Sequence, residues 1–194
     1  MTAEGTTEVV TAALDRAASS TMEVLRLVRA EQMSAPTPCA SWDVHALINH
    51  FIGTPRWWVA VLEGTDQDPA PDYAAGDYAA AYEESIRIAR AAFSAEGAMQ
   101  RLVQTEMGEF PGAVLLGFAA TDQLAHAWDL ARAIGRPTAG LDPDLAEVLL
   151  AQASMAITDA YRGPDGVAVF GPEQPAPAGA APADRLAAFL GRSV

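Results

Sequence analysis

Residues 114–134 restrict the fold of this chain more than any other segment. They follow a continuous helical pattern that stops at Gly135 and Pro137, a typical end for a helix. Apolar residues cover nearly the whole circumference, which is typical of a helix surrounded by other helices. The only polar residues in the segment are Thr121, Asp122, Gln123, His126, Asp129 and Arg132. The segment therefore predicts an all-α protein with this helix near its centre.

Two of these polar residues, Asp122 and His126, are four positions apart and project from the same side of the helix. An ionised carboxylate inside a helical bundle is costly unless it is paired or coordinates a metal. We therefore interpret Asp122 and His126 as two ligands of a divalent ion, with a third ligand expected elsewhere in the chain. The alternative is that they pair with each other or with Arg132.

The rest of the chain consists mainly of further helical patterns joined by short turns. Ser41 is a good N-cap for the second of them, Pro55 is expected to bend it, and Gly64 ends it. A short extended piece is expected at residues 102–105, and residues 163–182 are predicted to form a wrapping loop. The expected helices span residues 7–33, 42–63, 77–94, 142–161 and 183–190, in addition to the central one.

Composition sets limits on the fold class and on partners. With 194 residues, 51% of them hydrophobic, the chain can bury a full core, and we expect a single domain over residues 1–194. We find no apolar run long enough to span a membrane, and a formal charge of −13 disfavours nucleic acids and anionic lipid surfaces as partners. The single cysteine and the absence of a secretory pattern over residues 1–5 predict a cytoplasmic protein.

Two histidines lie on the predicted second helix. Ala46 and Gly53, one turn to either side of His50, leave open space around its imidazole. His45 is about 140° away around the helix, so it cannot face the same ion and is expected on the surface. The alternative is that His50 is a core histidine that makes its hydrogen bonds within the protein and binds no metal. Cys39, in the preceding turn, is interpreted as a small buried hydrophobe rather than a reactive thiol.

Two motifs resemble a known family. The string TPCASWDV at residues 37–44, followed by Leu47, Asn49, His50 and Gly53, resembles the opening motif of the actinobacterial DinB-like metal-binding proteins, which include the N-terminal domain of mycothiol-dependent maleylpyruvate isomerase. The residues from Thr121-Asp122 through HAWDLAR at 126–132, with Gly135-Arg136, resemble the second motif of that family. The closing residues 184–192 also fit one subgroup.

The resemblance implies a DinB-like four-helix bundle, here with additional short C-terminal helices, and a divalent metal held by three side chains. Matched position by position, the ligands are His50, Asp122 and His126. This chain has Asp122 where the isomerase pattern has a glutamate, and it ends before a separate C-terminal domain could follow. Two imidazoles and one carboxylate are a common ligand set for catalytic zinc, and nickel, iron or manganese would also fit.

Two functional hypotheses follow. As the resemblance implies, the metal could bind mycothiol or a similar small thiol and present it to an electrophilic substrate, as in a thiol transferase or isomerase. Alternatively, the protein is a metal-containing bundle that binds a small molecule or a partner without turnover. Asp129 is interpreted either as a carboxylate that orients His126 or as the partner of Arg132 or Arg136. We name no catalytic side chain beyond the ligands, and the oligomeric state stays open, with a homodimer as one option.

Overall fold

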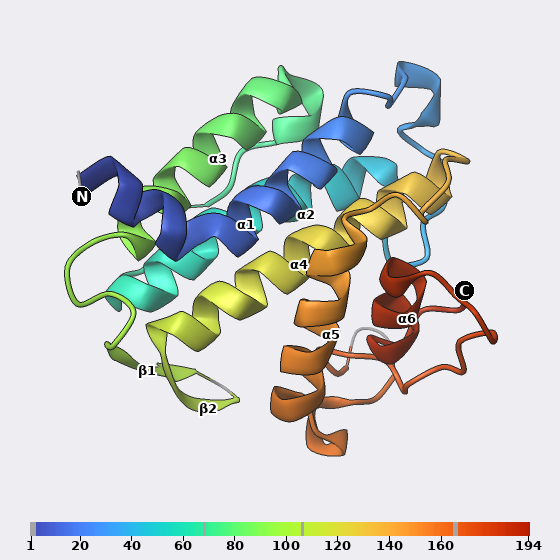
Figure 1. Ribbon diagram of the computed structural model, residues 1–194. Coiled ribbons are helices and arrows are strands. Elements are labelled where there is room, and N and C mark those ends of the chain that lie inside the picture. Colours follow the sequence, from blue (N-terminus) through green and yellow to red (C-terminus); the bar gives the residue numbers. More distant parts are fainter. Residues whose placement is uncertain (1–2, 68, 106, 165–166) are drawn as a thin grey trace.

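The computed structural model describes residues 3–67, 69–105, 107–164 and 167–194. Four helices form its core: α1 (Ala3–Leu25), α2 (Val44–Glu63), α3 (Tyr78–Phe93) and α4 (Gly112–Ala133). α4 packs against α1 and α2, and α3 closes the other side of that pair (Figure 1). The all-α, DinB-like four-helix bundle is therefore confirmed.

α4 is buried around nearly its whole circumference, as its composition predicts. Fifteen of its residues are buried, and they include His126 and Asp129. The first of them, Gly112, leaves no room for a side chain, because a Cβ there would lie 2.0 Å from the carbonyl oxygen of Ala98. α4 is therefore closely surrounded by its neighbours from its first residue onward.

Two short helices complete the chain beyond the bundle. α5 (Pro143–Ala156) and α6 (Pro182–Phe189) pack against each other and against α4 (Figure 1). α5 begins as predicted, with the Asp142 side chain accepting a hydrogen bond from the backbone N–H of Leu145 and with Pro143 in the first turn. It ends at Ala156 rather than at residue 161, and a short 3-10 turn, Asp159–Tyr161, follows.

The extended piece predicted at residues 102–105 is one arm of a small hairpin. β1 (Leu102–Thr105) pairs antiparallel with β2 (Gly108–Pro111), and the register places Val103 opposite Phe110. The hairpin joins α3 to α4 (Figure 1). In the part of the chain that the structure describes, no helix has the length and apolarity needed to cross a membrane.

The prediction for the start of α2 was wrong in one detail. Asp43, not Ser41, is the N-cap, and its carboxylate accepts a hydrogen bond from the backbone N–H of Ala46. Trp42 consequently lies outside the helix, where its ring contacts His50. Pro55 lies inside the helix and Gly64 ends it in a left-handed conformation, as predicted.

The first helix is shorter than the predicted span of residues 7–33, since α1 ends at Leu25. The segment that follows turns back and supplies acceptors to α2. The N–H of Val44 donates to the carbonyl of Ala35, and the N–H of His45 donates to the carbonyl of Met33. These bonds satisfy donors that every helix start leaves unpaired.

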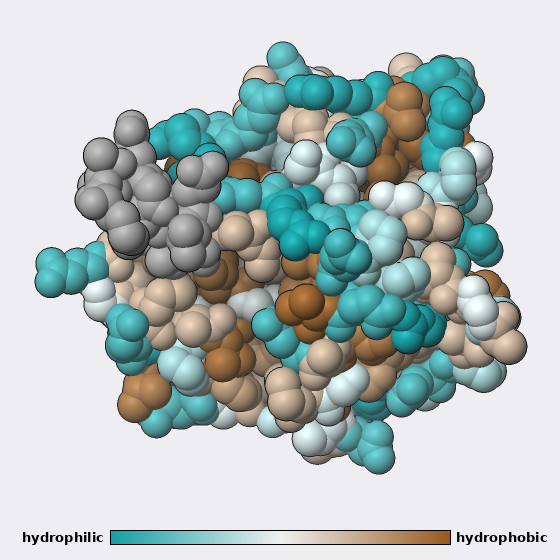
Figure 2. Space-filling view, in the orientation of Figure 1, coloured by the Kyte–Doolittle hydropathy of each residue, from teal (hydrophilic) through white to brown (hydrophobic). Residues whose placement is uncertain are grey.

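The outer surface mixes hydrophilic and hydrophobic residues. Figure 2 shows one face, on which the hydrophobic residues form small groups separated by hydrophilic ones. Exposed apolar side chains of this kind are usual on soluble folds and do not mark a site by themselves. The candidate site therefore has to be found from the interior of the bundle.

Candidate metal centre

The structure brings the three predicted ligands together, one from α2 and two from α4. Oδ1 of Asp122 lies 3.4 Å from Nε2 of His50 and 3.4 Å from Nε2 of His126. The donor atoms of the three residues all lie within 4.8 Å of one another. Zinc bonds to nitrogen and oxygen are about 2.0–2.2 Å long, and ligand atoms at tetrahedral angles are then about 3.4 Å apart. The two distances from Asp122 match this spacing.

The position of the proton on His126 leaves two hydrogen-bond acceptors facing each other in this cluster. Asp129 is acceptor-only when ionised, and its Oδ2 lies 2.9 Å from Nδ1 of His126, so the proton of a neutral imidazole is on Nδ1. Nε2 then points a lone pair toward the carboxylate of Asp122. Two acceptors facing each other inside a protein repel, and either a second proton on His126 or a metal ion between them removes the repulsion.

Neighbouring charges shift the pKa of both Asp122 and His126. Burial disfavours the charged form of His126, but the charge of Asp122 and the hydrogen bonds that the imidazolium donates to Asp122 and Asp129 overcome it and hold the pKa of His126 well above 6.5. Burial likewise acts to raise the pKa of Asp122, yet the neighbouring charge of His126 lowers this pKa below 3.8. A proton on His126 therefore occupies the position that a metal would take, and the two compete.

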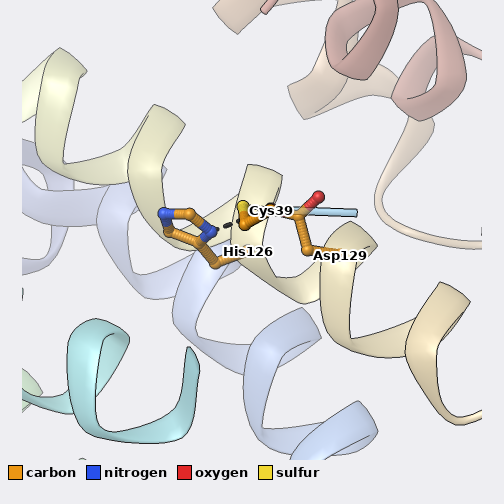
Figure 3. Close-up of side chains that lie close together, drawn as sticks. All are labelled: Cys39, His126 and Asp129. Atoms are coloured by element: carbon orange, nitrogen blue, oxygen red, sulfur yellow. Dashed lines mark hydrogen bonds and ion pairs between the residues drawn. The ribbon is translucent and has the colours of Figure 1, made fainter. Parts of the chain in front are cut away.

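Asp129 is held in place from three directions. Its Oδ2 accepts hydrogen bonds from His126, from the Cys39 thiol at 3.2 Å and from Nη2 of Arg192 at 2.9 Å. Figure 3 shows the first two of these partners beside it. Burial opposes ionisation, but the charge of Arg192 dominates and lowers the pKa of Asp129 below 3.8. Asp129 thus stays ionised and fixes the tautomer and orientation of His126.

Asp122 is also oriented by its neighbours. Its second oxygen, Oδ2, accepts a hydrogen bond from Nε2 of Gln123 at 3.1 Å. The amide of Gln123 is fixed in turn, because its Oε1 accepts from the hydroxyl of Tyr82 at 2.7 Å. Oδ1 is thereby left to face the two histidines.

The second helix positions His50. The ring of Trp42 lies over its imidazole, with a centroid separation of 4.3 Å. Thr54, one turn along α2, donates its hydroxyl to the backbone carbonyl of His50, and its Oγ1 lies 3.2 Å from Nε2. A hydroxyl therefore stands beside the nitrogen that faces Asp122.

The cluster lies in the wall of a large cavity of about 1540 Å³. One end of the cavity is polar and contains the three candidate ligands, Cys39 and Thr54. Away from these residues the lining comes from α2, α4, the hairpin and the C-terminal loop, and it is mostly apolar, with a few polar side chains such as Gln67 and Gln104. We call this part the apolar end of the cavity. A ligand bound at the three-residue cluster can therefore extend into an apolar space.

Not every residue singled out in the sequence belongs to the cluster. His45 lies on the surface, 41% exposed, with its Nε2 2.8 Å from a carboxylate oxygen of Asp72. Asp129 does contact His126, as one interpretation expected, but its cationic partner is Arg192 instead of Arg132 or Arg136. Cys39 is half-buried and lines the cavity, so the interpretation as a plain buried hydrophobe was incomplete.

The family can be assigned from comparison with known proteins. The sequence profile of the mycothiol maleylpyruvate isomerase N-terminal domain matches residues 14–131. The chain belongs to this family. Two uncharacterized proteins of Mycobacterium tuberculosis, from strains CDC 1551 / Oshkosh and ATCC 25618 / H37Rv, are each 40% identical to it over 184 residues, which cover 92% of this chain and 95% of the relative. No solved structure matches the chain significantly.

In this member of the mycothiol maleylpyruvate isomerase N-terminal domain family, the matched region contains all three candidate ligands and Asp129. Arg192 lies far beyond it, in the last turn of the chain. No local sequence signal connects Arg192 with Asp129, because the two residues meet only when α6 packs against α4. The bundle core carries the ligands, and the C-terminal segment supplies the charge that holds Asp129.

Proposed function

We propose that this protein binds one divalent metal ion, zinc or nickel, through His50, Asp122 and His126, and that it is a thiol-dependent transferase or isomerase acting on a small electrophile. The observation that carries the proposal is the common distance of 3.4 Å from two imidazole nitrogens to one carboxylate oxygen at the end of a large cavity. The family supports mycothiol, or a thiol like it, as the co-substrate.

Three protein ligands leave the ion below its preferred coordination number of four to six. Bound in this way, a divalent ion supplies Lewis acidity, which lowers the pKa of a thiol ligand so that it reacts as the thiolate. In the reaction the sulfur supplies the electron pair for a new carbon–sulfur bond, and the thiol proton goes to solvent. In a transferase the pair of the displaced bond leaves with the leaving group. In an isomerase the sulfur adds to a conjugated carbon–carbon double bond, whose π pair moves onto the conjugated carbonyl, and the return of that pair breaks the carbon–sulfur bond and releases the thiolate.

The side chains of this protein have separate tasks in that chemistry. Asp129 holds the Nδ1 proton of His126 and keeps Nε2 free as a ligand. Gln123 holds one oxygen of Asp122 so that the other faces the histidines. The hydroxyl of Thr54, beside Nε2 of His50, is placed to hydrogen-bond a group bound next to that nitrogen. Trp42 covers one side of the cluster and limits the access of water.

Elemental analysis of the purified protein tests the metal. We expect one equivalent per chain, and severe loss of metal in the separate His50→Ala and His126→Ala proteins. His45→Ala is the matched control, since it removes an imidazole from the same helix but not from the cluster. A wild-type protein that is purified without chelator, contains less than about a tenth of an equivalent and takes up neither zinc nor nickel would refute the site.

Cobalt substitution tests the thiol. A thiolate is a softer ligand than water, so mycothiol or a cysteine derivative should produce a sulfur-to-cobalt charge-transfer band in the near ultraviolet. The band should be absent in His126→Ala and should weaken as the pH falls and the thiol is reprotonated. A Cys39→Ser protein is the control for a signal from the chain's own thiol. If thiols leave the spectrum unchanged and other small ligands alter it, the protein is a metal-containing small-molecule binder.

A further inference from the structure

The apolar end of the cavity is lined by aromatic rings from both helices of the cluster. Trp57 and Trp58 come from α2 and Phe118 comes from α4. Trp58 stacks on Phe118 with centroids 6.1 Å apart, and Trp57 meets Trp58 edge-on at 4.6 Å. Seven residues separate Trp57 from His50, which corresponds to about 10 Å along a helix. The aromatic wall is thus within reach of a small molecule that also touches the cluster.

Trp57 is the residue of this wall that core packing does not explain. Its side chain is 44% exposed, whereas Trp58 is buried. A half-exposed indole at the mouth of an apolar cavity loses much of its contact with water when a flat ring binds against it. Two aromatic rings in an offset-stacked or edge-on arrangement stabilise a complex by more than the burial of their surface area alone would.

The charges around the cavity disfavour a second anion. Among the described residues that line it, Arg192 is the only arginine or lysine. Its guanidinium is already used, because Nε and Nη2 donate to Asp129 and Nη1 donates to the carbonyl of Leu190. The other charged side chains among these described lining residues, apart from the histidines, are Asp66 and Asp122. A metal ion at the cluster would be balanced by Asp122 and by one thiolate.

We propose that the substrate of this site is an uncharged, apolar electrophile whose planar group binds against Trp57, and that the cavity disfavours a substrate with an anionic group in its apolar end. The assignment of this ligand as the substrate rests on the proposed function. An anionic group in the apolar end would lose water of hydration, and among the described lining residues no arginine or lysine is free to pair with it. Burial of an unpaired charge is strongly unfavourable. A flat neutral group meets aromatic and aliphatic surface there and displaces water.

Isothermal titration calorimetry with two probes of the same ring size tests this. Naphthylmethanol is neutral, and naphthalenesulfonate carries a charge on a group that is a poor metal ligand. We expect the alcohol to bind at least about tenfold more tightly than the sulfonate. Trp57→Ala should weaken binding of the alcohol roughly three- to tenfold, the range expected for one lost aromatic pair. Val148→Ala, which shortens an exposed side chain on α5 outside the cavity, should leave binding unchanged.

A charge-reversal experiment separates charge from shape. Gln104 is exposed on β1 and lines the apolar end, so Gln104→Arg adds a cation without disturbing the core. The Gln104→Arg protein should bind the sulfonate more tightly than wild type does, so the ratio of the two affinities should fall. Equal affinity of the two probes for the wild-type protein, or unaltered binding of the alcohol to Trp57→Ala, would overturn the proposal. So would an unchanged preference in Gln104→Arg.

The titrations are carried out on both metal-loaded and chelator-treated protein. The preference for the neutral ring should persist in both, since the aromatic wall and Arg192 do not depend on the metal. A protein that takes up no metal but keeps this preference would refute the proposed function and leave the ring site standing. A protein that binds metal and thiol but shows no preference between the two probes would refute the ring site and leave the proposed function standing.

Discussion

Replacing Asp129 by asparagine should weaken metal binding without removing a metal ligand. The carboxylate accepts from His126, Cys39 and Arg192, all of which are donors. An amide has one acceptor oxygen and must turn its NH₂ group toward at least one donor. His126 then loses the partner that fixes its tautomer. Changes of this kind beside a ligand cost about 10–100-fold in metal affinity, which is about 1.4–2.7 kcal/mol.

The same substitution should also destabilise the fold. Arg192, whose side chain is 14% exposed, would be left without the carboxylate that neutralises it. Removing one member of a buried ion pair costs about 3–5 kcal/mol, which for a chain of this size lowers the melting temperature by on the order of 10 °C. The two effects have different causes, and the assay has to separate them.

Competition with a chromophoric chelator, at a temperature well below unfolding, gives the metal dissociation constant of each folded protein. Thr138→Val is a suitable control because it removes a buried hydroxyl that donates to Asp184 and not to a residue of the cluster. It should lower the melting temperature and leave metal affinity unchanged. If Asp129→Asn binds metal as tightly as wild type, Asp129 does not orient His126 for ligation, and the reasoning above is wrong.

Three further outcomes are expected. Because the pKa of His126 is raised well above 6.5, the proton competes with the metal, so apparent affinity should fall steadily as the pH is lowered through neutrality; a pH-independent dissociation constant would contradict this. The pKa of Asp129 is depressed below 3.8 in the fold, so its stabilising contribution is present above about pH 4 and is lost below it. In urea unfolding of chelator-treated protein, the difference between wild type and Asp129→Asn should therefore shrink below pH 4. Finally, metal at about a hundredfold excess over its dissociation constant should add about 2.7 kcal/mol, and a chelator that leaves the melting temperature unchanged would show that the ion does not stabilise the native state.

Much of the site could be predicted from local pattern. Asp122 and His126 lie one turn apart on a helix whose composition already indicated burial, so their convergence needed only helical geometry. His50 and His45 were separated by the same argument, and the structure places one in the cluster and the other on the surface. The helix ends at Gly64 and Gly135 could also be predicted from the local sequence, because a glycine in the left-handed conformation ends a helix without a tertiary partner.

The misses share a tertiary cause. Ser41 and Asp43 are both good N-caps, and the choice of Asp43 depends on Trp42 packing over His50 from outside the helix. α1 ends at Leu25, and in the segment that follows it Met33 and Ala35 provide carbonyls to a helix that comes later in the chain. The pairing of Asp129 with Arg192, rather than with a nearer arginine, follows from the docking of α6. These contacts form between separate segments of the chain, and no local pattern of residues predicts them.

The ion pair between Arg192 and Asp129 also sets an order on folding. It can form only once α6 has docked on α4 and brought residues 190–192 to Asp129, and it contributes no contact between the four helices of the bundle. The helices of the bundle can assemble before that, with Asp129 still hydrated and His126 free to turn. We expect the chain to reach a compact helical intermediate quickly and to acquire its ligand-binding geometry in a slower final phase, when residues 190–192 dock. A metal offered during refolding would then bind tightly only after the fold itself is nearly complete.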